Sequence, residues 1–391
     1  MLIPLDLAPL SDDERAHEAR LAADLRAEIA AAGGWISFAR FMERVLYAPG
    51  LGYYAAGAHK LGAGGDFITA PELSPVFGRC VASQCAEVLA SLGGGGILEL
   101  GAGTGSLAVE VLRELERVGV LPERYEILEP SPDLRARQQQ AVASLRPALR
   151  DRVVWLDRIP VEPFRGVLLA NEVLDALPVE RFRIAASGAV ESLGVCVAGA
   201  GFGWSARPAS AELAAAVADL GVVLPTGFVS ELALRQGAWL ASVTAPLGAG
   251  VALFFDYGLR RADYYAADRD GGTLACFHRH RRHDDVFANL GLQDLTAWVD
   301  FTRVAEGALD AGLEVAGYTT QAHFLLGTGF ESHLAALRAQ TDPAREPLCA
   351  GAAARLVLPS EMGERFKCIA LAREYPGGLA GFRLRDFTAA L

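Results

Sequence analysis

Short apolar runs alternate with stretches of helical spacing through the middle of the chain. Residues 107–118 carry apolar side chains at helical spacing, and the short apolar runs that flank them predict buried strands. Strands that alternate with helices are typical of a parallel sheet with helices on both faces. The pattern therefore predicts an α/β core. The expected strands of this core are 97–100, 125–128, 152–156, 166–171 and 250–256.

The same patterns predict further elements outside this core. Over 181–204 the apolar period shifts towards two, with glycines at the expected turns, which indicates a β-hairpin insertion. Residues 259–300 have few apolar repeats and many charges, so we expect a long loop, and loops of that length are usually functional. Helices are expected over 11–32, 36–47, 74–92, 231–247 and 301–311, and strands over 314–318 and 365–372.

Length and composition describe a globular protein with more than one part. The 391 residues exceed the size at which one hydrophobic core keeps growing, so we expect a main domain with insertions. The residues are 52% hydrophobic and 21% charged, as in globular proteins. The longest apolar runs are too short to span a bilayer, and the first residues are acidic, unlike a secretory or transit peptide. We therefore expect a cytoplasmic protein without stable membrane insertion.

Charge and cysteine content narrow the expected partners. The net charge of −11 disfavours nucleic acid and suits a basic protein substrate, although ordinary solubility explains the same excess. Six scattered cysteines without a C-x-x-C pair fit buried thiols in a reducing compartment. Three histidines, His278, His280 and His283, have the spacing of metal ligands, but the arginines between them would oppose a cation. We therefore expect no metal site.

A glycine-rich loop follows the first expected strand and leads into a helix. The loop residues Gly101, Ala102, Gly103, Thr104 and Gly105 form G-x-G-x-G, whereas a dinucleotide site requires G-x-G-x-x-G and has glycine where this chain has serine. Glycines allow the backbone to approach a ligand, and a helix start offers unpaired N–H groups. The spacing favours S-adenosylmethionine (SAM) as the cofactor, with a tight structural turn as the alternative.

Acidic residues at the strand ends support a SAM site. Glu99, just before the loop, suits the cationic methionine end of SAM. Glu129, followed by Pro130, is placed to accept hydrogen bonds from both ribose hydroxyls, although it could instead neighbour a helix cap. Asp157 follows the third strand, where an adenine amino group could be met, and Asn171 could position the cofactor or the acceptor. The carboxyl ends of parallel strands share one edge of a sheet, where ligands bind.

Several segments of the chain resemble those of one family. With the glycine loop 99–105, they make this chain resemble the MidA family of SAM-dependent methyltransferases, over roughly 37–372. Mitochondrial members of that family are complex I assembly factors that methylate an arginine of a complex I subunit. The chain departs from many relatives at Ala70, where they carry serine, and in its set of arginines at 279, 281 and 282. The other matching segments are 52–54, 65–74, 77–78, 170–178, 256–258, 280–284, 294–301 and 362–367.

The resemblance implies a class I SAM-dependent methyltransferase fold, which is Rossmann-like. Its sheet is parallel apart from one reversed strand, with helices on both faces, an N-terminal helical segment and an inserted subdomain. The expected division is an N-terminal helical region and cofactor lid in 1–92, the SAM-binding core in 93–180 and the β-hairpin insertion in 181–230. A core helix and fifth strand follow in 231–258, a substrate-facing loop in 259–300 and the rest of the core in 301–391.

The resemblance also implies an arginine of a protein, a complex I subunit, as methyl acceptor. Glu172 and Asp175 follow the fourth strand, and if that segment is helical both carboxylates lie on one face and can hold a guanidinium. Asp256, at the end of the fifth strand, is a third catalytic candidate. Each of these acids could instead cap a helix or pair with an arginine.

Further site residues are expected around this centre. By analogy with N-terminal segments of the fold, Thr69 and Pro71 are expected to bind the cofactor, and Asp66 to belong to the same lid. Tyr53 is expected to contact the substrate, as are His280 and His283 from the long loop. Two other functions remain open. One is a small-molecule methyltransferase, and the other is a SAM-binding assembly chaperone with little catalysis.

Overall fold

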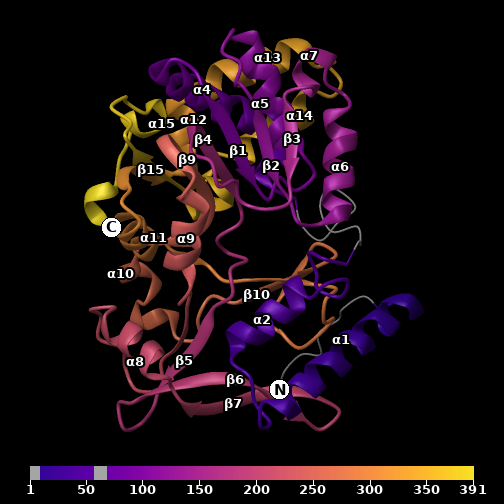
Figure 1. Cartoon of the computed structure of the whole chain (residues 1–391), viewed down its shortest axis with the longest axis vertical. Coiled ribbons are helices and arrows are strands. Elements are labelled where there is room, and N and C mark those ends of the chain that lie inside the picture. Colours follow the sequence, from indigo (N-terminus) through magenta and orange to yellow (C-terminus); the bar gives the residue numbers. More distant parts are fainter. Residues whose placement is uncertain (1–8, 57–67) are drawn as a thin grey trace. The chain divides into compact units, whose positions relative to one another are not determined.

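Two compact units make up the part of the chain that the computed structural model describes, residues 9–56 and 68–391 (Figure 1). We call them the core unit and the second unit. The core unit comprises Ile68–Leu174, Gly237–Arg260 and Val299–Leu391. The second unit comprises the remaining segments, so its chain is interrupted by the core unit. The expected lid residue Asp66 lies outside the described residues.

The core unit is built on an eight-stranded sheet. Its order is β14-β15-β9-β4-β1-β2-β3, with the short strand β13 paired to β9. β15 runs antiparallel to both of its neighbours, whereas the pairs β9–β4, β4–β1, β1–β2 and β2–β3 are all parallel. This confirms the expected α/β fold with one reversed strand. The strands are β1 (Gly96–Leu100), β2 (Tyr125–Leu128), β3 (Val153–Leu156), β4 (Phe164–Asn171), β9 (Leu247–Leu259), β13 (Val299–Asp300), β14 (Glu314–Thr320) and β15 (Phe366–Arg373).

Helices cover both faces of this sheet, and two adjacent residues of β9 define the faces. Successive side chains of a strand point to opposite faces. Phe255 meets Phe77 of α4 (Pro75–Leu92) edge-to-face at 5.3 Å between ring centroids, whereas Phe254 meets Trp239 of α9 (Gln236–Thr244) at 6.3 Å. Gly237 of α9 lies against Gly307, so α11 (Phe301–Asp310) covers the same face as α9.

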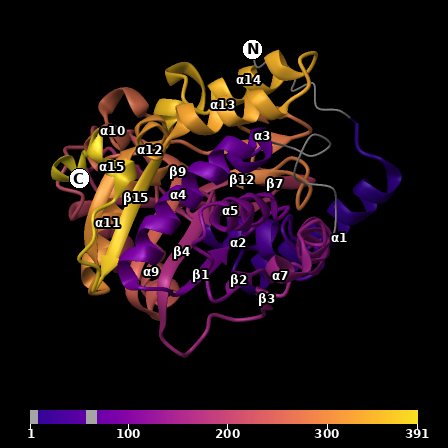
Figure 2. The ribbon, with the colours of Figure 1, turned by 90° about the horizontal axis from the view of Figure 1, so that it is seen from above.

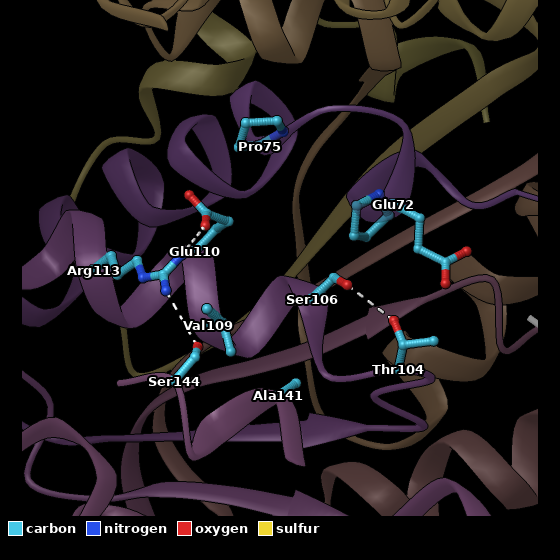
Figure 3. A pocket seen from close by; sticks show the side chains of 10 residues that line it. Glu72, Pro75, Thr104, Ser106, Val109, Glu110, Arg113, Ala141 and Ser144 are labelled. Atoms are coloured by element: carbon cyan, nitrogen blue, oxygen red, sulfur yellow. Dashed lines mark hydrogen bonds and ion pairs between the residues drawn. The ribbon is translucent and has the colours of Figure 1, made fainter. Parts of the chain in front are cut away.

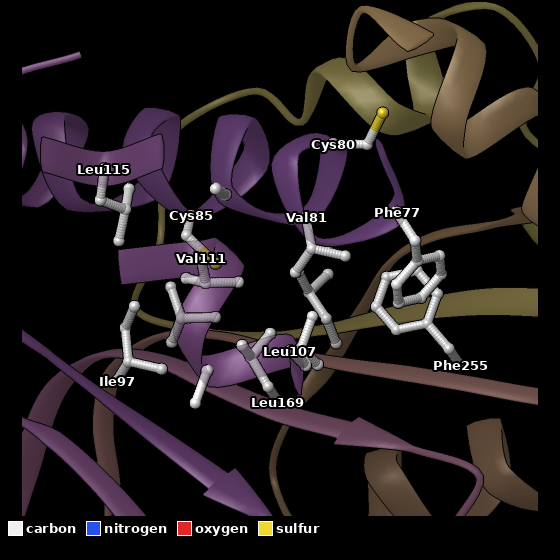
Figure 4. Packing of buried hydrophobic residues seen from close by; sticks show 14 of the residues in the cluster. Phe77, Cys80, Val81, Cys85, Ile97, Leu107, Val111, Leu115, Leu169 and Phe255 are labelled. Carbon is white, nitrogen blue, oxygen red and sulfur yellow. The ribbon is translucent and has the colours of Figure 1, made fainter. Parts of the chain in front are cut away.

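The face below α4 carries the main hydrophobic core (Figure 4). α4 packs beside α5 (Ser106–Arg117), and side chains such as Val81 and Val111 from these helices meet Leu169 of β4. Each large apolar side chain buried in this way stabilises the fold by roughly 1.5–3 kcal/mol. Further elements of the unit are α3 (Ala70–Leu73), α6 (Pro132–Val142), α7 (Pro147–Arg150), α12 (Gln321–Gly327), α13 (Phe330–Gln340), α14 (Glu346–Arg355), the turn Pro359–Gly363, α15 (Ala380–Arg383) and the 3-10 turn Thr388–Ala390. Figure 2 shows α12, α13 and α14 as neighbours.

Three glycines lie side by side where the central strands begin. Gly96 of β1 pairs with Gly166 of β4, which in turn pairs with Gly250 of β9. Gly166 and Gly250 both have a φ of 140°, and a Cβ on Gly166 would lie 1.9 Å from the carbonyl oxygen of Gly96. The backbones approach so closely here that only glycine fits.

The second unit contains two small antiparallel sheets and two long helices. Its sheets have the orders β7-β6-β5-β8 and β11-β10-β12. Ser11 begins the first helix with a capping box to Glu14, and Ser37 caps the second. The elements are α1 (Asp12–Ala31), α2 (Phe38–Tyr47), β5 (Glu180–Ile184), β6 (Val190–Ala198), β7 (Gly201–Pro208), α8 (Ala211–Ala218), β8 (Val229–Leu232), α10 (Arg261–Tyr264), the 3-10 turn Ala267–Arg269, β10 (Ala275–His278), β11 (Arg281–His283) and β12 (Asp294–Thr296).

Two of the expected elements were wrong. The segment 259–300 is not one long loop, because it holds the β11-β10-β12 sheet, whose strands of three or four residues are too short to give a periodic signal. The helix expected over 231–247 begins only at Gln236. Glu231 belongs to β8, where it is fully buried, pairs with Arg181 across the sheet and accepts the N–H of Thr273 at 2.8 Å. Within the described residues, no helix is long and apolar enough to cross a bilayer.

Candidate functional site

The glycine loop lies between β1 and α5 and takes backbone angles that glycine alone adopts readily. The φ values of Gly101, Gly103 and Gly105 are 61°, 54° and 83°. A Cβ on Gly105 would lie 3.1 Å from the Cα of Gln138, because α6 passes close to the loop. Among the described residues, no side chain caps the first turn of α5, so its first N–H groups can meet a ligand. The loop therefore has the form of a ligand cradle.

Glu99 points from β1 to the neighbouring strand. It is buried, and the Tyr125 hydroxyl of β2 donates to its Oε2 atom at 2.7 Å. Burial, opposed by this hydrogen bond, raises the pKa of Glu99 to about 7. The carboxyl thus has a protein partner, and its expected role at the methionine end of SAM stays a prediction.

Glu129 follows β2 and is also buried. Its Oε1 accepts the N–H of Ser131 at 2.9 Å, and its Oε2 accepts the amide Nε2 of Gln138 at 3.0 Å. Burial raises the pKa of this carboxyl, and the hydrogen bonds from Ser131 and Gln138 oppose that shift. Ser131 is the N-cap of α6, with Pro130 just before it, so Glu129 is indeed a cap neighbour. That position also leaves it at the carboxyl edge of the sheet, as a ribose-binding role requires.

Asp157 follows β3, next to the end of β2. Its largely exposed carboxylate pairs with Arg135 of α6 at 2.8 Å, and Arg135 also donates to the carbonyl oxygen of Leu156 at 2.9 Å. The same guanidinium reaches the carbonyl oxygen of Glu129 at 3.3 Å. Arg135 thereby holds together the two strand ends that carry the predicted cofactor acids.

The end of β4 has an unusual backbone. Glu172 has a φ of 54°, in the left-handed region that non-glycine residues rarely adopt, and its N–H donates to the carbonyl oxygen of Phe255 at 2.8 Å. The Asn171 amide donates to Oε1 of Glu172 at 2.9 Å. Residues held in this region cluster at functional sites, where the surrounding structure maintains them.

The segment after β4 is not helical, so the condition for aligning Glu172 with Asp175 is not met. Residues 172–179 form bends and turns, so no helical face aligns Glu172 with Asp175. The N–H groups of Glu172 and Leu174 are bonded to β9 instead, to the carbonyl oxygen of Phe255 and to the carboxylate of Asp256. Asp175 begins the second unit, where its carbonyl oxygen accepts the N–H of Ala297 at 3.0 Å.

Asp256 in β9 is fully buried beneath this turn. Its Oδ2 accepts the N–H of Leu174, and its Oδ1 accepts the N–H of Tyr257, both at 2.9 Å. The carboxylate thus binds backbone on both sides. This geometry ties the segment after Glu172 to β9, and the catalytic role expected for Asp256 stays a prediction.

Thr69 and Pro71 lie at the start of α3, close to the loop. Thr69 is the N-cap, and Glu72 completes a capping box with it. Pro71 and Glu72 line a hollow of about 630 Å³ that also includes Thr104 and Ser106, whose hydroxyls lie 2.9 Å apart (Figure 3). The other lining residues are Pro75, Val109, Glu110, Arg113, Ala141 and Ser144. The hollow therefore follows the outer side of α5 beside the loop, and none of the strand-end acids lines it.

The expected substrate contacts belong to the second unit. Tyr53 is buried and packs edge-to-face on Tyr54 at 5.1 Å, and the Tyr54 hydroxyl donates to Asp294 at 2.9 Å. Burial raises the pKa of Tyr54, and the nearby carboxylates of Asp294 and Asp175 add to that shift. These residues form one buried polar cluster in the second unit.

His280 lies at the tip of the β10–β11 hairpin. Arg279 and His280 are its two-residue loop, and both have positive φ, 49° and 61°, which is the type I′ geometry usually given to Asn-Gly. His283 is buried, its Nδ1 accepts the N–H of Asp285 at 3.3 Å, and burial lowers its pKa. The neutral imidazole of His283 therefore faces protein, whereas His280 is exposed.

Sequence reasoning missed two residues of this site. Gln138 of α6 is fully buried, and its amide contacts Gly103, Glu129 and Trp155. Trp155 of β3 donates its indole N–H to this amide at 3.0 Å. A single polar residue on the inner side of a helix breaks its apolar pattern, and that break is the only signal that the sequence offers.

Comparison with known proteins decides the family. Residues 80–319 match the sequence model of a family described as "Putative S-adenosyl-L-methionine-dependent methyltransferase". The chain belongs to the MidA family of SAM-dependent methyltransferases. Among curated MidA relatives, the zebrafish (Danio rerio) protein arginine methyltransferase NDUFAF7, mitochondrial, is 32% identical and aligns over 86% of this chain and 83% of its own length. The Drosophila melanogaster homologue is 30% identical over 96% of this chain and 90% of its own.

A solved MidA structure supports the cofactor. A protein from Burkholderia thailandensis, in a crystal structure bound to S-adenosyl-homocysteine, is 43% identical with a TM-score of 0.93, covering 99% of this chain and 100% of its own. SAM is the cofactor of this family. The loop of this chain fits that group, because its backbone is left without side chains where it turns: a Cβ on Gly101 or Gly105 would lie 3.3 Å from Val173 or 3.1 Å from Gln138, and the N–H groups at the start of α5 can face the cofactor.

Proposed function

We propose that this methyltransferase transfers the methyl group of SAM to the guanidinium of an arginine in a protein substrate, by resemblance a respiratory complex I subunit. The observation that carries the proposal is Glu172, a carboxylate held in a left-handed conformation at the end of β4. The names of the zebrafish and fly relatives, both arginine methyltransferases, support the same acceptor.

The residues around the loop are proposed to hold the cofactor. SAM supplies an electrophilic methyl group on a sulfonium. The N–H groups of the loop and of α5 are proposed to bind its polar atoms, with Glu129 accepting the ribose hydroxyls. Glu99 is assigned to the methionine end of SAM and Asp157 to its adenine. Asn171 is assigned to the amino group of the cofactor. Thr69 and Pro71 are assigned to the segment that covers the cofactor.

Glu172 is proposed to bind the acceptor. A guanidinium stays protonated at neutral pH, so its nitrogen becomes nucleophilic only when a carboxylate orients it and takes up the proton. The nitrogen electron pair forms the new C–N bond as the S–C bond breaks towards sulfur, and the N–H proton leaves to Glu172 or to solvent. The amide of Asn171, at 2.9 Å from Glu172, is placed to orient that carboxylate. Asp175, Tyr53, His280 and His283 remain predicted substrate contacts from the second unit.

The direct test is incubation of the purified chain with labelled SAM and either cell proteins or a metabolite extract. We expect label on arginine of a protein, identified by mass spectrometry, and loss of that label in Glu172→Gln. The matched control is Glu162→Gln, an exposed acid before β4. Label only in metabolites would favour a small-molecule methyltransferase. Complex I assembly that is normal with the inactive variant would favour a SAM-binding assembly chaperone.

A further inference from the structure

Gln138 lies at a junction of the three strand ends that carry the cofactor site. Its Nε2 donates to the carbonyl oxygen of Gly103 and to Oε2 of Glu129, both at 3.0 Å, and its Oε1 accepts the indole N–H of Trp155 at 3.0 Å. These contacts connect α6 to the loop after β1, to the end of β2 and to β3.

The orientation of this amide is determined by its partners. An indole N–H can only donate, whereas a carbonyl oxygen and an ionised carboxylate can only accept. The nitrogen must therefore face Gly103 and Glu129, and the oxygen must face Trp155. Both amide protons have acceptors, and the side chain is fully buried, so the contacts are protected from water.

The contact with Gly103 also orients the peptide that follows it. A trans peptide is planar, with its C=O and N–H pointing in opposite directions. Because the Gly103 carbonyl oxygen points at Gln138, the N–H of Thr104 points away from α6. The α6 backbone also lies close to Gly105, because a Cβ on Gly105 would lie 3.1 Å from the Cα of Gln138. This contact keeps the helix and the loop at a fixed separation.

We propose that Gln138 is a positioning residue for SAM, whose amide holds the Gly103 peptide and the Glu129 carboxylate in the relative arrangement that the adenosyl group requires. This rests on the proposed assignment of Glu129 to the ribose, and it is independent of what the acceptor is. Gln138 acts through these two groups and need not touch the cofactor.

The first test removes the hydrogen bonds and keeps the volume. In Gln138→Leu the Glu129 carboxylate and the Gly103 carbonyl lose a donor, so we expect the Kd of S-adenosylhomocysteine, measured by calorimetry, to rise by about tenfold or more. Gln140→Leu changes an exposed glutamine of the same helix and should leave the Kd unchanged. An unchanged Kd in folded Gln138→Leu would overturn the proposal, because a merely structural role lowers stability without weakening the ligand.

The second test keeps the hydrogen bond from Trp155 and adds a negative charge. Gln138→Glu places a second carboxylate against that of Glu129, with Arg135 as the cation that also acts on Glu129. The two acids can share one proton at low pH but repel each other when both ionise. We expect the affinity of this variant for S-adenosylhomocysteine to fall by about tenfold as the pH rises and both carboxyls ionise, whereas wild-type affinity does not fall in this way. Equal pH profiles would count against the proposal.

A third variant, Glu129→Gln, tests the ribose assignment of Glu129 separately from the positioning role of Gln138. If Glu129→Gln binds S-adenosylhomocysteine as tightly as wild type, the ribose assignment fails, and the positioning role fails with it. If Glu129→Gln binds weakly and Gln138→Leu binds normally, only the positioning role fails. Neither result depends on methyl transfer, so the arginine proposal is tested separately.

Discussion

The carboxylate of Asp256 accepts the backbone N–H of Leu174 at 2.9 Å, and this bond ties the segment after β4 to the end of β9. The other carboxylate oxygen accepts the N–H of Tyr257 at the same distance. Since both partners are donors, a carboxylate fits here and an amide does not.

Asp256→Asn should destabilise the chain and disturb the turn that carries Glu172. The new NH₂ group must face one of two N–H donors, so we expect a loss of about 1–3 kcal/mol in the free energy of unfolding. Because Leu174 is two residues after Glu172, we also expect kcat to fall more than affinity for S-adenosylhomocysteine. Urea unfolding, calorimetry and steady-state rates measure the three effects. Asp268→Asn, at an exposed position, is the control. Wild-type kcat in the variant would show that the turn does not need this bond.

Glu99→Gln should change how stability depends on pH. Burial raises the pKa of this carboxyl from an ordinary 4.5 to about 7 in the folded chain. The protonated Glu99 carboxyl therefore contributes to the free energy of unfolding, and this contribution is fully present below pH 4.5 and is lost as the pH rises through about 7. The variant cannot ionise, so its advantage over wild type should grow across this window to on the order of 3 kcal/mol.

Urea unfolding at pH values on both sides of that window measures the difference. Glu231 in the second unit has its pKa raised in the same way, to about 7, by burial. Some pH dependence should therefore persist in Glu99→Gln. A constant difference between variant and wild type across the window would contradict the shift of Glu99.

Gly166→Ala should prevent stable folding of the core unit. Its Cβ would lie 1.9 Å from the carbonyl oxygen of Gly96, and its φ of 140° is unfavourable for any L side chain. We expect a loss of more than about 3 kcal/mol or insoluble protein. The same change at Gly351, inside α14 with nothing within 4 Å, should instead stabilise by about 0.5–1 kcal/mol. Thermal unfolding of the two variants compares them, and equal effects would contradict the close strand approach.

His280→Gly should stabilise the chain and lower its activity. Glycine adopts the φ of 61° at the tip of the β10–β11 hairpin without the cost of about 1 kcal/mol that a side chain carries there. If His280 contacts the substrate, KM for the protein substrate should rise several-fold, while the Kd of S-adenosylhomocysteine stays unchanged. The control for stability is His280→Asn, because asparagine at this exposed position also tolerates a positive φ. Unchanged kinetics in both variants would remove His280 from the substrate site.

The sheet and the cofactor loop could be predicted because both produce local patterns in the sequence. Strands of four or more residues with apolar runs, and glycines at alternate positions, are visible without tertiary contacts. The α/β fold and the SAM cofactor were therefore predictable and are confirmed. The hydrogen bond from Leu174 to Asp256 was not predictable, since it joins β9 to a turn 82 residues earlier in the chain.

Other parts of the site could not be predicted for similar reasons. The alignment of Glu172 with Asp175 assumed helical bonds that the backbone makes instead with β9. Gln138 has partners 35, 9 and 17 residues away, none of which its own helix reveals. The small β11-β10-β12 sheet has strands too short for periodicity to distinguish from loop.

The chain passes between the two units close in sequence to Glu172 and Asp256. The polypeptide leaves the core unit directly after Leu174 and again directly after Arg260. Glu172 precedes the first exit by two residues, and Asp256 precedes the second by four. If Glu172 binds the acceptor as we propose, both the acceptor carboxylate and Asp256 are joined to the second unit by only a few peptide bonds.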